Sequence, residues 1–150
     1  MRTREFLLAF LLVSPAFAGE AKIYLDEADK FADTKIEAGE QEIQFQAWAT
    51  KTQIELRFSR LPKTCAESFD ITEAHELAKA LHTAEDFNPV GAGGEIKTLH
   101  VAYKSLEFIV SDTIEFSCKN PMSFIGAKIN IKELKEISGS VERALAYKLE

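Results

Sequence analysis

The first regular pattern along the chain is an alternation of apolar and polar positions over residues 42–49. Ile43, Phe45 and Ala47 occupy every second position, and glutamines and Trp48 stand between them. This spacing is typical of a β-strand with one buried face, because successive side chains of a strand point to opposite sides of the sheet. The pattern therefore predicts a strand whose wetter face carries Trp48.

Similar alternation recurs in four later runs, three of which are joined by only a few residues. Connections that short join antiparallel neighbours. We expect one more strand within residues 124–131. Before the first run we expect only a short strand near residues 22–25, followed by loosely packed chain, because little apolar surface is available there. The four runs are residues 54–59, 99–103, 106–110 and 114–118.

After the second of the five runs, the apolar spacing becomes that of a helix. Asp70 and Glu73 have the spacing of a capping box, in which each side chain accepts a hydrogen bond from the backbone amide of the other residue. Pro89 ends the helix, because proline cannot continue it. The narrow apolar stripe between these limits consists of Ala74, Leu77, Ala78, Leu81 and Ala84.

The C-terminal segment has a second helix pattern. Asn130 and Glu133 make another capping box, and Ile137 continues the helical spacing. The pair Ser138-Gly139 then interrupts it, because glycine is unfavourable inside a helix. We therefore predict a short helical C-terminus.

Together these elements predict an α+β fold with one antiparallel sheet of about five strands, the main helix packed on one face and a short helical C-terminus. The glycine-rich residues 89–94 are expected to be a connector, because they leave a helix and enter a strand, whereas phosphate-binding loops enter a helix. The predicted core consists of Ile43, Phe45, Ile54, Leu56, Phe58, Leu77, Leu81, Leu99, Val101, Leu106, Phe108, Val110, Ile114 and Phe116.

The N-terminal residues have the organisation of an export signal. Arg2 and Arg4 precede an apolar run too short to span a bilayer, and Ala16-Phe17-Ala18 matches a signal-peptidase site. We predict that residues 1–18 are a signal peptide, that residues 19–150 form a single α+β domain, and that the mature protein is periplasmic or secreted.

The chain has two cysteines, Cys65 and Cys118. An oxidising compartment favours a disulfide between them, and the pair lacks the C-x-x-C spacing of redox or metal-binding cysteines. A bridge closing so long a loop should stabilise the fold by about 4 kcal/mol in the chain-entropy model. We expect it to join the last strand of the sheet to the start of the main helix.

The net charge of −6 narrows the classes of partner and of chemistry. An acidic protein repels phosphate backbones, so we do not expect nucleic acid as a partner. The chain has no G-x-S-x-G motif, and its neighbouring carboxylates resemble an ordinary polar surface more than a poised catalytic pair. We therefore predict no catalytic residue, no cofactor and no metal.

The best candidate for a surface site is the polar face of the main helix, with Trp48 as a second candidate. His75, Lys79, His82 and Asp86 share that helix face. His82 and Asp86 have a spacing that allows metal binding, but Lys79 places a cation beside them, so a solvated face with local ion pairs is the favoured interpretation. We expect Trp48 to pack against a loop or the N-terminal segment, with a contact site as the alternative.

These observations favour a non-catalytic binding protein that is exported, such as an inhibitor, immunity or accessory protein, with an acidic surface for a protein partner. No stable membrane insertion is expected after removal of the signal. One alternative is a small envelope hydrolase with a cleft lined by Glu73, His75, His82 or Asp86. Another is a structural component of the cell envelope that associates through a sheet edge or a C-terminal lysine face comprising Lys128, Lys132 and Lys135.

Overall fold

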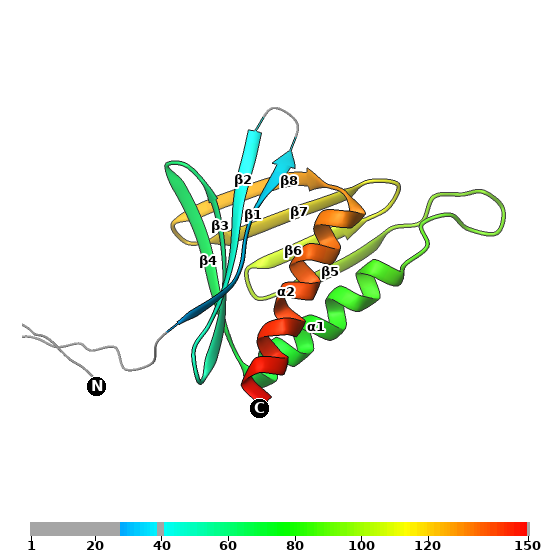
Figure 1. Cartoon of the computed structure of the whole chain (residues 1–150). Coiled ribbons are helices and arrows are strands. Elements are labelled where there is room, and N and C mark those ends of the chain that lie inside the picture. The colour runs from blue at the N-terminus through cyan, green and yellow to red at the C-terminus, as the bar shows by residue number, and fades with distance from the viewer. Residues whose placement is uncertain (1–27, 39–40, 150) are drawn as a thin grey trace, which may run out of the picture.

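The computed structural model describes residues 28–38 and 41–149, so the predicted signal peptide and the predicted strand near residues 22–25 lie outside the described part. The described chain forms four strands, a helix, four more strands and a second helix (Figure 1). These elements are β1 (Asp29–Ala38), β2 (Gln41–Ala49), β3 (Gln53–Arg60), β4 (Lys63–Asp70), α1 (Ile71–Asp86), β5 (Leu99–Tyr103), β6 (Leu106–Val110), β7 (Ile114–Asn120), β8 (Ser123–Ile129) and α2 (Ile131–Leu149).

The first sheet is an antiparallel meander with the strand order β1-β2-β3-β4. Its register places Phe45 opposite Phe58 and Ala47 opposite Leu56, and all four side chains are buried. The alternation seen in the sequence therefore does bury one face of this sheet. The outer face carries the polar residues and Trp48.

The second sheet is a separate antiparallel meander with the order β5-β6-β7-β8. Phe108 lies opposite Phe116, and Leu106 lies opposite Cys118, with all four buried. The turn between β5 and β6 contains Lys104 with φ at 53°, in the left-handed region that tight hairpin turns use.

The prediction of a single sheet with the main helix on one face is wrong, because the described strands form two four-stranded sheets. β1 and β4 were not predicted as strands. β4 buries Cys65 and Phe69 with the half-buried Glu67 between them on the same face, so its apolar alternation is interrupted. The described side chains of β1 include only two buried ones, those of Ala32 and Ile36, which is too few for a clear pattern.

One hydrophobic cluster joins the two sheets. The ring centroids of Phe58 and Phe116 are 4.5 Å apart, and those of Phe116 and Phe108 are 5.1 Å apart. The predicted core residues are buried, except that Leu99 and Val101 are only partly buried against the cluster. Aromatic side chains at this spacing supply much of the apolar surface that holds the sheets together.

Helix α1 begins as the sequence predicts. The backbone amide of Glu73 donates to Oδ1 of Asp70 at 2.8 Å, and the amide of Asp70 donates to Oε1 of Glu73 at 2.9 Å. All five residues of the predicted apolar stripe are buried. The helix packs against α2 and against β3, β4 and β5 (Figure 1).

The prediction of a short helical C-terminus is also wrong, because α2 is 19 residues long and continues through Gly139. The capping box at its start does form, with the amide of Glu133 donating to Oδ1 of Asn130 at 2.8 Å. Ser140 keeps its hydroxyl satisfied inside the helix by donating to the carbonyl of Glu136 at 2.7 Å. The helix packs on β1, β2 and β3, and burial there outweighs the low helix propensity of glycine. No described helix has the length and hydropathy needed to cross a membrane.

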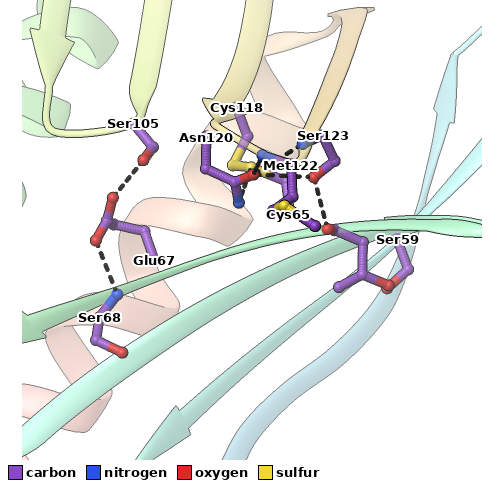
Figure 2. The surroundings of a disulfide bond; sticks show 10 residues. Ser59, Cys65, Glu67, Ser68, Ser105, Cys118, Asn120, Met122 and Ser123 are labelled. Carbon is purple, nitrogen blue, oxygen red and sulfur yellow. Dashed lines mark hydrogen bonds between the residues drawn. A yellow bond between two sulfur atoms is a disulfide. The ribbon is translucent and has the colours of Figure 1, made fainter.

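Cys65 and Cys118 form a disulfide with an S–S distance of 2.03 Å, which confirms the predicted pairing (Figure 2). Both cysteines are fully buried. The bridge joins β4 of the first sheet to β7 of the second, whereas we expected it to join a strand to the start of the helix. It therefore fixes one sheet against the other.

Candidate functional site

The residues of the predicted surface site lie on two separate surfaces. His75, Lys79, His82 and Asp86 are exposed on α1, whereas Trp48 lies on the outer face of the first sheet. The helices pack on the opposite face of that sheet, where the buried side chains gather. The structure therefore does not bring Trp48 together with the helix residues.

His82 contacts both helices. Its Nδ1 atom lies 3.8 Å from Oε2 of Glu85, and its Nε2 atom contacts the carboxylate of Glu142 on α2. His82 therefore links α1 to α2 through the carboxylate of Glu142. Within the two described ranges, no group of three or more histidine, cysteine, aspartate and glutamate residues is arranged to hold a metal.

Trp48 packs among side chains of its own sheet. The Nζ atom of Lys30 lies 5.0 Å from the ring centroid, and Cζ of Arg57 lies 5.5 Å from it. The indole Nε1 donates to Oε1 of Gln46 at 3.3 Å. These cation–π contacts and the hydrogen bond cover the ring with neighbours from β1 and β3.

The clearest perturbed pKa lies at the turn between β5 and β6. The hydroxyl of Tyr103 donates to Oε1 of Glu76 at 2.6 Å, and this hydrogen bond, with desolvation second, raises the pKa of Tyr103 to about 12. Desolvation opposes the charge on the next residue, Lys104, but the hydrogen bond that its ammonium donates to Glu73 and the charges of Glu67 and Glu73 raise its pKa overall. The hydrogen bonds and ion pairs of Tyr103 and Lys104 connect the turn to β4 and α1, so contacts that hold the fold together account for both pKa shifts.

A better candidate site is a groove of about 630 Å³ at the other end of α1. We name it the acidic groove. It lies among the C-terminal end of α1, the start of α2, the turn between β6 and β7, and the end of β8. Its apolar lining includes Phe87, Pro89, Val110, Ile114, Ile129 and Ile131.

The charges around the acidic groove are strongly one-sided. Four carboxylates line it, those of Glu37, Glu85, Asp112 and Glu133, together with one ammonium, that of Lys128. Residues 89 and 110–114 reach it from loops and strand ends, and α2 contributes its first turn. The groove therefore combines apolar surface with a net negative charge.

Two of these acids, Glu133 and Glu85, differ in the hydrogen bonds that their carboxylates accept. Glu133 accepts hydrogen bonds from two backbone amides, that of Asn130 at 2.9 Å and that of Glu37 at 2.9 Å. Oε2 of Glu85 is buried and accepts no hydrogen bond from the described residues, and Nδ1 of His82 lies 3.8 Å from it. The fold thus fixes the Glu133 carboxylate, whereas the Glu85 carboxylate can still accept a hydrogen bond.

No protein-family model matches the chain, and no curated protein matches its sequence. The acidic groove is assembled from acids at positions as distant as Glu37 and Glu133, which the sequence pattern does not connect. The one signal that pointed to part of it was the capping box at the start of α2, which places Glu133 at a helix N-terminus.

Proposed function

We propose that the protein is an exported, non-catalytic binding protein whose acidic groove holds a cationic, partly apolar segment of a protein partner. The observation that carries this proposal is the composition of the groove, with four carboxylates and one ammonium around an apolar lining. A binding role in the periplasm or outside the cell agrees with the Cys65–Cys118 bridge, because disulfides persist in oxidising compartments.

Both properties of the groove suit lysine or arginine side chains next to apolar ones. The long aliphatic stems of these residues pack on apolar surface while their charged ends reach carboxylates. A volume of about 630 Å³ accommodates a few side chains of a bound segment. Charge complementarity of this kind gives fast association that weakens as salt is added.

The proposal is tested with a short synthetic peptide of alternating lysine and leucine, titrated into the protein by calorimetry at low salt. The test variant carries Glu37→Gln and Asp112→Asn, two exposed acids of the groove. Loss of two partner charges should weaken binding about tenfold, because exposed ion pairs contribute up to about 1 kcal/mol each.

A matched control removes two exposed acids elsewhere, with Asp86→Asn on α1 and Glu115→Gln on β7, neither of which lines the groove. Both variants have the same net charge, so non-specific attraction falls equally in both. We expect the control to bind within about twofold of the unmodified protein. Equal weakening in the two variants, or no binding of the peptide at low salt, would contradict the proposal.

A further inference from the structure

Two hairpin turns, between β3 and β4 and between β7 and β8, lie side by side at one edge of the molecule (Figure 1). The first turn carries Leu61, which is 87% exposed, and the second carries Met122, which is 91% exposed. We name this pair of turns the hairpin wedge. Single exposed apolar residues are common, but two large ones on neighbouring turns make a candidate interaction surface.

The two turns are fixed to each other, so their exposure does not come from loose chain. The hydroxyl of Ser123 donates to the carbonyl of Thr64 at 2.8 Å, which joins the end of one turn to the start of β4. Asn120 accepts hydrogen bonds from the amides of Met122 and Ser123, both at 2.9 Å. The Cys65–Cys118 disulfide lies directly behind these contacts (Figure 2).

The charge of the hairpin wedge is opposite to that of the whole protein. Exposed lysines flank the apolar residues, with Lys63 in the first hairpin and Lys119 in the second. Residues 60–64 and 119–124 contain no acid, although the chain has a net charge of −6. Glu42 lines the same hollow as Leu61, but its carboxylate is paired with Lys35 at 3.5 Å.

We propose that the hairpin wedge rests on the surface of a lipid bilayer that contains anionic headgroups. Leu61 and Met122 enter the boundary between headgroups and acyl chains, and Lys63 and Lys119 contact lipid phosphates. A fluid surface accepts two protruding tips at any spacing, whereas a protein would need two matching pockets. The flexible side chains here also suit lipid better than a shaped pocket, because protein hot spots favour tryptophan, tyrosine and arginine.

This contact is reversible adsorption and differs from insertion of a spanning segment. Two apolar side chains and two lysines give weak binding that depends on anionic lipid and on salt. The hairpin wedge and the acidic groove share no residue, so contact of the wedge with lipid does not use the side chains that line the groove. The inference therefore does not depend on the proposed function.

The test is co-sedimentation of the full chain, with its disulfide intact, with vesicles of phosphatidylcholine alone or with added phosphatidylglycerol. We expect binding to the anionic vesicles at low salt and little binding to the neutral ones. The double variant Leu61→Ser and Met122→Ser should bind at least about tenfold more weakly. The double variant Lys63→Gln and Lys119→Gln should lose most of the dependence on phosphatidylglycerol.

A matched control replaces two other exposed apolar residues, with Val90→Ser and Ile96→Ser in the loop after α1, which are 51% and 53% exposed. This control should bind vesicles as the unmodified chain does. Absence of binding to anionic vesicles, equal binding to neutral vesicles, or equal loss in the control would overturn the proposal. Sedimentation velocity without lipid provides a second check. Self-association that the Leu61 and Met122 changes abolish would show that the hairpin wedge is a contact between copies of the chain, and this result too would overturn the proposal.

Discussion

Oε2 of Glu133 in α2 accepts a hydrogen bond of 2.9 Å from the backbone amide of Glu37 in β1, across 96 positions of sequence. The same carboxylate caps α2 through the amide of Asn130. One side chain thus fixes the start of the second helix to the first strand and shapes the rim of the acidic groove.

Replacement of Glu133 by alanine should lower the free energy of unfolding by about 1–2 kcal/mol, because two backbone amides lose their acceptor. Urea denaturation followed by circular dichroism measures this change. Glu115→Ala serves as the control, since Glu115 is exposed on β7. A Glu133→Ala effect no larger than the control would show that these hydrogen bonds do not stabilise the junction.

The contact between Phe58 and Phe116 joins the two sheets, so its loss should lower the stability of the whole domain. Phe116→Ala removes a ring that is 2% exposed and touches rings of both sheets, so it should destabilise the protein by about 3–5 kcal/mol. Phe124, on the neighbouring strand, is 55% exposed, and Phe124→Ala should cost less than about 1 kcal/mol. Similar losses for the two variants, measured by denaturation, would contradict a shared core.

Gly139 tests the continuity of α2. Alanine has a higher helix propensity, and its methyl group would meet only the end of the half-exposed Arg143 side chain, at 3.3 Å, a contact that a small shift of this long side chain relieves. Gly139→Ala should therefore stabilise the protein by about 0.5–1 kcal/mol. Gly94→Ala is the opposite case, because Gly94 has φ at 86°, and alanine there should destabilise. A destabilising Gly139→Ala would indicate that the helix is broken at this residue, as the sequence pattern predicted.

Tyr103 predicts a change of stability at alkaline pH. Its pKa is raised to about 12 in the folded protein, mainly by the hydrogen bond to Glu76. In the unfolded chain the pKa of tyrosine is about 10. The hydrogen bond of Tyr103 therefore contributes fully to the free energy of unfolding below pH 10, and this contribution is lost as the pH rises through 12. Tyrosinate absorbance of the unmodified protein minus that of Tyr103→Phe measures the pKa directly. Glu76→Gln should move it toward the ordinary value, and an unchanged titration would refute the assigned cause.

The sequence predicted those elements whose apolar spacing was undisturbed. β2, β3, β5, β6, β7 and α1 follow from alternation or helical spacing together with one capping box, and β8 followed as one more strand. β4 was missed because Glu67 interrupts the apolar alternation on its inner face. In the structure the Glu67 carboxylate accepts a hydrogen bond from Ser105 and forms an ion pair with Lys104, both in the β5–β6 turn of the other sheet. Only tertiary contacts explain why a glutamate is acceptable there.

The division into two sheets was not predictable from pattern alone. Strand alternation specifies which face is buried but not what it packs against, so the chain before and after α1 looked like parts of a single sheet. The same limit applies to the candidate site. Glu37, Glu85 and Asp112 are ordinary surface acids in the sequence, and only the fold brings them to one groove.

The most direct test of this account is nuclear magnetic resonance mapping of the lysine–leucine peptide on the isotope-labelled protein. We predict that amide shifts will change at residues 110–114 and 129–133, which line the acidic groove, and that added salt will reverse the changes. Changes confined to the outer face around Trp48, or spread evenly over the acidic surface, would contradict a binding site in the acidic groove.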